Sequence, residues 1–373
     1  MHYSTVYVGM DVHKGNFSLC CYTNEKEEAE YPQKVEAHYS KVINYLEAMR
    51  FHYGDDVLFI CGYEAGCLGF TLYHELEAHN VKCVILAPTT MPVAGGKKRI
   101  KTDKRDAARI ARCLAHHDYS PVHVPTAQDE QVKEYLRMRD DHKLALKKVK
   151  QQILAFCLRH GYHYDGTKNH WTQAHINWLR MLKVSGLYQE ILEEYLLTYD
   201  YLTAKLTQID KRIEELAEDE SYRENVSKLK CFLGIKTQTA LSVITETGDF
   251  KRFPDAGHYA AYLGLVPGED SSGGDQNRLG ITKAGNRHLR MLLVEASQSY
   301  ARGQAGHKSK ALAERQEGNS PAVIQYADKA NERLRRKFYR LTLKNSKKAN
   351  VAKTAIAREL ACFIWGMMTE HYA

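Results

Sequence analysis

The chain has 373 residues, 44% of them hydrophobic and 26% charged, and its 53 Lys and Arg against 45 Asp and Glu give a formal net charge of +8. This length favours two or three folded domains, and so mild a positive charge does not by itself establish nucleic-acid binding. Nine scattered cysteines with no C-x-x-C spacing argue against a disulfide framework or a zinc ribbon, and the lack of an apolar leader or membrane-length apolar run favours a cytoplasmic protein.

Residues 1–125 alternate between predicted strands and helices. Apolar side chains alternate with other residues in a first strand at 5–11, and a turn-like segment leads to a second strand at 17–22, which predicts an antiparallel hairpin. The elements expected after it are a helix at 38–50, a strand at 57–62, a helix at 70–79, a strand at 81–87 and a helix at 103–116. This order predicts an α/β fold with parallel strands beyond the hairpin.

Residues 126–225 are predicted to form a helical middle part. A long charged helix is expected at 132–160, with Leu136, Leu144 and Leu154 as its apolar anchors. The segment 187–218 carries a heptad, whose apolar positions are Leu192, Tyr195, Tyr199, Leu202, Leu206, Ile209, Ile213 and Leu216. Such a seam fits a coiled coil between two chains or a hairpin packed within one chain against 132–160, and both arrangements stay open.

Residues 226–373 form the third expected part, which is mainly helical. Two short helices are predicted around a turn at 233–237, followed by a Gly/Ser/Asp-rich loop at 264–282, a helix at 286–302 and two C-terminal helices. The segment from Pro321 to Lys353 contains ten Lys and Arg but only two acidic residues, so a local basic surface is expected. A surface of this kind fits nucleic-acid contact, and an ordinary solvated helix face is the alternative.

Four carboxylates stand where an α/β sheet gathers ligands. Asp11 ends the first predicted strand and Glu64 ends the strand at 57–63, while Asp103 and Asp106 lie three apart at the start of a helix. Carboxylates converging from two strand ends and one helix suit Mg²⁺, and a pair of such ions can hold a phosphodiester. The two helix acids could instead serve only to complement the helix dipole.

Three segments around these acids resemble a known family. Residues 7–14 (YVGMDVHK), 63–66 (YEAG) and 101–107 (KTDKRDA) are similar to the N-terminal domain of the DEDD insertion-sequence transposases, which are related to the Piv DNA invertase. That resemblance implies a ribonuclease H-like fold similar to the RuvC resolvase. It also implies that Asp11, Glu64, Asp103 and Asp106 form a tetrad for Mg²⁺, with Mn²⁺ as a second choice.

The C-terminal part resembles the same family at 264–267 (GLVP), 271–274 (SSGG) and 279–286 (LGITKAGN). By itself a Ser-Ser-Gly-Gly segment is most often a flexible turn. The resemblance implies that Ser272 is a nucleophile that forms a phosphoserine link with DNA, and Ser271 is the alternative one residue away.

The resemblance also implies nucleic-acid partners. Residues 229–247 resemble a helix–hairpin–helix, although Lys236 stands where a second glycine is usual. Members of the family use a structured RNA of the element as a guide, so an element end, a target DNA and a guide RNA are the expected partners. The candidate contacts are Lys97, Lys98, Arg99, Lys101, Lys236, Lys283, Arg335, Arg336 and Lys337.

These features together predict a transposase or recombinase of an insertion sequence, acting in a prokaryotic cytoplasm at the nucleoid. Two strand exchanges need at least two protomers, so a homo-oligomer, dimer or tetramer, is expected. A metal-dependent nuclease that resolves DNA junctions with water as nucleophile is the alternative enzyme. A DNA- or RNA-binding protein without catalysis is the third possibility, and it would keep its function after Asp11→Asn.

Overall fold

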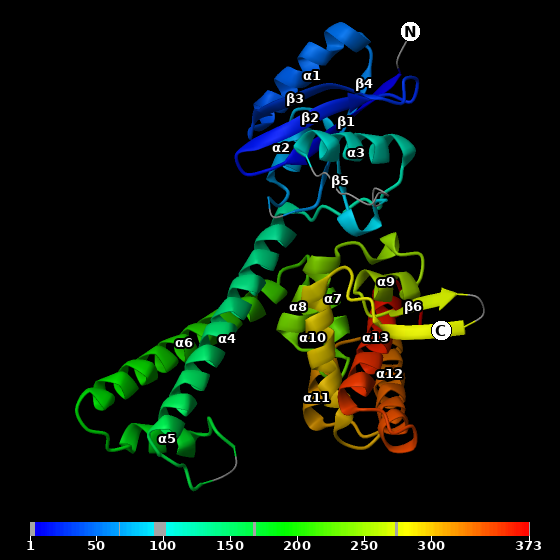
Figure 1. Ribbon diagram of the computed structural model, residues 1–373. Coiled ribbons are helices and arrows are strands. Elements are labelled where there is room, and N and C mark those ends of the chain that lie inside the picture. Colours follow the sequence, from blue (N-terminus) through cyan, green and yellow to red (C-terminus); the bar gives the residue numbers. More distant parts are fainter. Residues whose placement is uncertain (1–3, 67, 93–101, 167–168, 273–274, 373) are drawn as a thin grey trace. The chain divides into compact units, whose positions relative to one another are not determined.

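The computed structural model describes residues 4–66, 68–92, 102–166, 169–272 and 275–372, and it divides into two compact units, Met1–Val124 and Pro125–Ala373 (Figure 1). The basic loop at 95–99 and Lys101, with the candidate contacts Lys97, Lys98 and Arg99, lie outside the described residues. Among the described helices, none is both long and apolar enough to cross a membrane.

The first unit is built on a five-stranded sheet with the order β3-β2-β1-β4-β5. Its elements are β1 (Thr5–Val12), β2 (Asn16–Tyr22), β3 (Ala29–Glu36), α1 (Tyr39–Tyr53), β4 (Leu58–Glu64), α2 (Thr71–Ala78), β5 (Lys82–Leu86), η1 (Pro88–Thr90) and α3 (Asp103–His116). The predicted antiparallel pairing of β1 with β2 and the parallel run β1-β4-β5 are confirmed. An α/β sheet of this mixed order fits the ribonuclease H-like expectation.

Strand β3 was not predicted from the sequence. It pairs antiparallel with β2 at the edge of the sheet, its side chains are mostly exposed, and it contains Pro32. An edge strand needs no apolar alternation and tolerates proline, so it carries little of the pattern by which buried strands are recognised.

The two faces of the sheet are covered by different helices (Figure 1). Val6, Val8 and Met10 of β1 are fully buried in a core shared with α1 and α2. The alternate residues of the same strand face α3, as the two-residue period of a strand requires. The alternation noted in the sequence therefore separates a core face from the face that carries Asp11.

Helix α3 lies directly on β1 and β4 because two glycines stand where it crosses them. Gly9 and Gly62 are register partners in the parallel ladder. A Cβ on Gly9 would lie 2.0 Å from the Ala107 carbonyl oxygen, and one on Gly62 would lie 2.7 Å from Leu114 Cδ1. Any side chain at Gly9 would meet helix backbone, which cannot move without lifting α3 from the sheet.

The second unit is almost entirely helical. Its elements are α4 (Ala127–Arg159), α5 (Gln173–Met181), α6 (Leu187–Ala217), α7 (Arg223–Lys230), α8 (Thr237–Thr247), η2 (Phe250–Arg252), α9 (Ala256–Tyr262), β6 (Pro267–Ser272), β7 (Asp275–Ile281), α10 (Arg287–Ser297), η3 (Gln298–Ala301), α11 (Lys310–Gln316), α12 (Pro321–Tyr339), η4 (Arg340–Lys344) and α13 (Ala349–Met368).

The heptad of α6 packs against α4 within the chain (Figure 1). Leu192, Tyr199 and Leu202 share a core with Ile153 and Phe156 of α4. Of the two arrangements left open by the sequence, the structure contains the internal hairpin. Self-association stays a prediction, and it cannot use these buried seam positions while the hairpin is intact.

The middle and C-terminal segments share one core. Val132 of α4 and Ile209 and Ile213 of α6 belong to the same buried cluster as the helices α7 to α13. The predicted division into a middle domain that ends at residue 225 and a C-terminal domain that begins at residue 226 stays a prediction. The expectation that Leu144 anchors α4 is wrong, because Leu144 is 62% exposed.

The segment expected as a loop at 264–282 is instead an antiparallel hairpin of β6 and β7. Its residues are glycine, serine and charged types with few β-branched side chains, so the strand signal is weak. The two helices expected around the turn at 233–237 are α7 and α8. Gly234 in that turn has a φ of +86°, which glycine adopts readily.

Replacing Gly9 by Ala tests the close contact between α3 and the sheet. We expect Gly9→Ala to lower the free energy of unfolding of the first unit by about 2 kcal/mol or more, because the new Cβ collides with backbone. Chemical denaturation gives the size of the effect, and hydrogen exchange should show faster exchange at the amides of α3.

Gly15→Ala is the matched control for that experiment. No atom lies within 4 Å of a Cβ built at Gly15, so we expect a change below about 0.5 kcal/mol. Equal effects of the two substitutions would contradict the steric account.

Candidate active site

The ends of β1 and β4 each present a carboxylate. Asp11 is the next-to-last residue of β1, and Glu64 is the last residue of β4. Each lies two residues after one of the paired glycines, Gly9 and Gly62, so both lie on the face that α3 covers. The two strand acids therefore reach the same edge of the sheet.

The N-terminus of α3 brings the other two acids to this unit's candidate site. Asp103 is the first residue of α3 and Asp106 follows three residues later. The Thr102 side chain caps the helix by accepting a hydrogen bond from the Arg105 backbone N–H at 3.4 Å. This cap explains why the helix begins where it does, and hence why both acids fall in its first turn.

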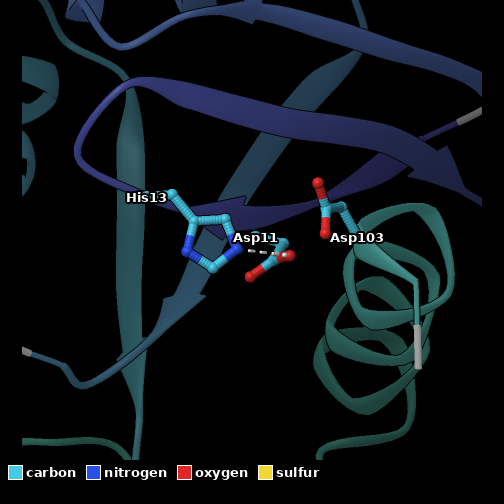
Figure 2. Close-up of side chains that lie close together, drawn as sticks. All are labelled: Asp11, His13 and Asp103. Atoms are coloured by element: carbon cyan, nitrogen blue, oxygen red, sulfur yellow. Dashed lines mark hydrogen bonds and ion pairs between the residues drawn. The ribbon is translucent and has the colours of Figure 1, made fainter.

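Two of the four acids meet a histidine. Figure 2 shows Asp11, His13 and Asp103 turned toward one another, the first two from the β1–β2 hairpin and the third from α3. Their potential ligand atoms all lie within 4.8 Å of one another, and His13 Nε2 is 3.2 Å from Asp11 Oδ2. Two carboxylates and an imidazole in this space form a donor set that fits a divalent cation.

Basic side chains of the protein hold the acids. Lys34 Nζ donates to Asp103 Oδ2 at 3.1 Å. Arg109 donates to Glu64, and its Nε lies 3.9 Å from Asp106 Oδ1. The structure therefore gathers Asp11 and Asp103 around His13, while Glu64 and Asp106 share one guanidinium.

The surroundings of the site shift the pKa values of Asp11 and Asp103 in opposite directions. Burial raises the pKa of Asp11, His13 acts against that rise, and the negative charges of Asp106 and Asp103 add to it. The hydrogen bond and the positive charge of Lys34 lower the pKa of Asp103, which is partly exposed. The chain thus accepts an unfavourable charge at Asp11, as is common in functional sites.

Sequence reasoning did not select His13, Lys34 or Arg109. His13 stands two residues after Asp11, and Arg109 stands three after Asp106 on one helix face, so both spacings were available as signals. Lys34 lies on β3, the strand that the sequence did not predict, and no local pattern joins it to a site 69 residues away.

The second unit carries the predicted serine. Ser272 is the last residue of β6, and its backbone pairs with Asp275 of β7, while Ser271 pairs with Gln276. Gly273 and Gly274 lie outside the described residues. The structure thus places Ser272, rather than Ser271, at the end of the strand.

The base of this hairpin is held by close backbone packing. A Cβ on Gly264 would lie 2.0 Å from the Ala284 carbonyl oxygen, and one on Gly285 would lie 2.0 Å from that of Tyr262. Arg290 donates to the carbonyl oxygens of Leu263 and Ala284 at 2.8 and 3.2 Å. Both glycines have positive φ, so other residues would be strained there even without a clash.

A buried carboxylate ties the same base to two other helices. The Glu246 side chain of α8 is only 4% exposed and accepts from Arg137 of α4 at 2.9 Å. It also accepts from Asn286 Nδ2 at 2.9 Å, and Asn286 caps α10 through the Leu289 N–H. This network sets where the chain leaves the hairpin and enters α10.

The predicted nucleic-acid contacts within the described ranges fall into two groups. Lys236 and Lys283 are exposed, and Lys283 has a left-handed φ of +57°. On α12, Arg335 donates to the carbonyl oxygens of Gln304 and His307, whereas Arg336 pairs with Glu332 and Lys337 with Glu359. Arg335 therefore has a structural task that the sequence did not reveal.

Comparison with known proteins covers both units. Residues 8–161 match a family profile of DEDD transposases of the IS110 type, described as transposase, and residues 226–314 match that of the transposase IS116/IS110/IS902 family. The chain is 31% identical over 350 residues to the transposase for insertion sequence element IS1533 of Leptospira borgpetersenii, covering 92% of this chain and 98% of that protein.

The chain belongs to the IS116/IS110/IS902 family of transposases. A putative transposase of Sinorhizobium fredii is 32% identical over 369 residues, or 99% of this chain and 90% of that protein. A pilin gene-inverting protein of Moraxella lacunata is 24% identical over 300 residues, or 78% and 81% of the two chains. As a member of this transposase family, the protein is a DNA-recombining enzyme, and it binds DNA.

The four acids and Ser272 lie inside the two matched segments of this IS110-type transposase. DEDD transposase domains are typically metal-dependent, and the cluster of Asp11, His13 and Asp103 is a group that could hold a metal ion. The family match thus agrees with the acidic edge of the first unit.

Neutralising Asp11 should raise the thermal stability of the protein without a divalent metal ion and reduce the stability that it gains from such an ion. The raised pKa means that folding favours protonated Asp11, so its ionisation at neutral pH costs stability. This cost grows as the pH rises from the unfolded-state pKa to the folded-state pKa, and it is absent below both. We therefore expect Asp11→Asn to raise the melting temperature in EDTA. In excess Mg²⁺ or Mn²⁺ the wild type should gain more stability than the variant, because ligand binding stabilises the folded state.

Asp56→Asn is the control, since Asp56 is exposed and lies in the loop before β4. Scanning calorimetry should give Asp56→Asn the same melting temperature as the wild type, both in EDTA and with the metal ion. An Asp11→Asn variant that is destabilised in EDTA, or stabilised by metal as much as the wild type, would contradict the role given to Asp11.

Proposed function

We propose that this transposase cuts and rejoins DNA by transesterification through a phosphoserine at Ser272. The acids Asp11, Glu64, Asp103 and Asp106 would hold Mg²⁺ or Mn²⁺ for this reaction. The observation that carries the proposal is that Asp11 and Asp103 gather around His13 while Glu64 and Asp106 contact one arginine, in a chain whose second family match contains the serine hairpin. The resemblance to the family, noted from the sequence, supplies the role of the serine.

The proposed exchange conserves the number of phosphodiester bonds. The Ser272 hydroxyl oxygen attacks phosphorus and loses its proton, the bond from phosphorus to a deoxyribose oxygen breaks, and that oxygen leaves as a hydroxyl group. A hydroxyl of a second DNA end then attacks the phosphoserine and releases the serine. A divalent ion, when bound, would neutralise charge on the phosphodiester and on the leaving oxygen.

The surroundings of the hairpin support this role. Its base is fixed by Gly264, Gly285 and Asn286, so the end that carries Ser272 extends from a rigid support. Lys283 is exposed at that base, at the opposite end of the hairpin from Ser272, and is a candidate contact for the nucleic-acid backbone. Its left-handed backbone is the kind of strain that is often found at functional positions.

A basic groove on α12 and α13 is the surface we propose for nucleic acid. It has a volume of about 590 Å³. Its lining residues are Lys329, Glu332, Arg333, Arg336, Lys337, Arg340 and Glu359. Burial acts to raise the pKa of Glu359, yet Lys337 and Arg333 outweigh burial and lower it, so this acid stays ionised between two cations.

Arg336 and Arg340 are exposed cations of this groove that project a positive surface suited to phosphates. A guide RNA and the DNA of the element and its target all offer such a backbone. The guide RNA is what the family resemblance implies, and the pairing of two or more protomers follows from the need for two strand exchanges.

Ser272→Ala should abolish the covalent link between protein and DNA and stop strand cleavage. DNA binding should survive, because contacts between basic residues and phosphates dominate affinity. A denaturing gel with labelled DNA substrate, run with Mg²⁺ and with Mn²⁺, measures the adduct as a band shifted by the mass of one protomer.

Ser271→Ala is the matched control and should keep the adduct. An adduct that persists in Ser272→Ala and vanishes in Ser271→Ala would move the nucleophile by one residue. A wild type that cleaves DNA without any adduct would identify a hydrolytic nuclease instead.

Arg336→Gln combined with Arg340→Gln should weaken nucleic-acid binding and its dependence on salt. Each lost phosphate contact should reduce the slope of log affinity against log salt by about 0.7 to 0.9. Fluorescence anisotropy over a range of salt concentrations measures this. Lys310→Gln, an exposed position on α11 outside the groove, should leave the slope unchanged. Equal slopes in all three proteins would rule out the groove as a phosphate contact.

A further inference from the structure

We propose that His13 is a direct ligand of the metal ion held by Asp11 and Asp103, and that the site consequently prefers a divalent transition ion such as Mn²⁺ over Mg²⁺. This inference rests on the proposed metal centre of the first unit. It adds a residue outside the four acids and a cation preference that four carboxylates alone would not produce.

The geometry of the three side chains fits one ion. Donor atoms on opposite sides of a single small cation lie about 4.2 Å apart, and neighbouring donors lie closer. The potential ligand atoms of Asp11, His13 and Asp103 are all within 4.8 Å of one another, so small side-chain rotations would bring them to one ion (Figure 2). Neither Glu64 nor Asp106 belongs to this group, since Arg109 engages both.

The position of His13 is set by the hairpin. Its backbone N–H donates to the Asn16 carbonyl oxygen at 3.0 Å, and Asp11 is paired with Ser18 in the β1–β2 ladder. The imidazole is 54% exposed, so its ring can turn without disturbing the core. The same nitrogen that now meets Asp11, Nε2, would be the metal ligand.

Among the three basic partners of the acids, only His13 can serve as a ligand. The guanidinium of Arg109 and the ammonium of Lys34 offer hydrogen-bond donors and no lone pair in their charged forms. A neutral imidazole has a free nitrogen lone pair and is the commonest metal ligand in proteins. An ion that binds the acids must therefore displace Lys34 and Arg109 from them, whereas His13 can coordinate the ion.

The choice of ligand affects which ion binds. Mg²⁺ prefers oxygen donors and keeps several waters, while an imidazole favours first-row transition ions. Mn²⁺ shares the preference of Mg²⁺ for carboxylates, and as a first-row transition ion it gains more affinity from an imidazole than Mg²⁺ does. A site with two carboxylates and one histidine should therefore bind Mn²⁺ more tightly than Mg²⁺.

The experiment uses the full chain with Mn²⁺ alone, followed by competition with Mg²⁺. Electron spin-echo spectroscopy of bound Mn²⁺ should show nitrogen modulation in the wild type and none in His13→Gln, which keeps a hydrogen-bond donor but removes the nitrogen ligand. His13→Gln should bind Mn²⁺ about tenfold or more weakly, a loss of the size seen when residues that support metal ligands are replaced. Its Mg²⁺ affinity should fall by less than about threefold.

His52→Gln is the matched control, because His52 is an exposed histidine of the same unit that stacks on Tyr31. It should keep both the modulation and the affinities. If His13 only balanced the charge of Asp11, its removal would change both affinities alike, and the wild-type spectrum would lack nitrogen modulation; either result overturns the proposal. A folded wild type that binds neither ion at millimolar concentration would instead overturn the metal centre itself.

Discussion

The contact of α3 with the sheet depends on two hydrogen atoms in place of side chains. Gly9 and Gly62 are neighbours across the parallel ladder, and the helix backbone fills the space that a Cβ would need. Because α3 comes this close, the acids in its first turn reach the edge where β1 and β4 end. The site of the first unit therefore follows from a packing constraint located two residues before each strand acid.

Bringing carboxylates together is unfavourable, and the chain offsets it with its own cations. Lys34 on an edge strand, Arg109 one turn after Asp106 on α3, and His13 in the hairpin each contact at least one acid. These contacts explain how the unit folds before any ion binds, since unpaired like charges at short range destabilise a fold. Under the proposed function, a metal ion that binds the acids would replace these side-chain cations.

The second unit solves a different problem, that of holding a glycine-rich hairpin in place. Helix α10, the 262–264 segment and Glu246 all contact residues 283–286, which connect β7 to α10. The apolar heptad positions of α6 pack against α4 of the same chain, and the C-terminal ones belong to the core formed by α7 to α13. Relatives that are named as transposases and as pilin gene-inverting proteins cover both units, so the combination of units is a property of the family rather than of this chain.

The sequence by itself determined the buried strands, the long helices and the places of the four candidate acids at strand ends and in the first turn of a helix, because periodic apolar residues and element ends are local signals. It did not reveal β3 or the β6–β7 hairpin, whose polar residues become strands only through pairing with a neighbour. Likewise, the heptad specified an apolar face, but only the fold decided that α4 covers it. His13, Lys34 and Arg109 became part of the site through tertiary structure, since a charge finds its partner by distance in space and not along the chain.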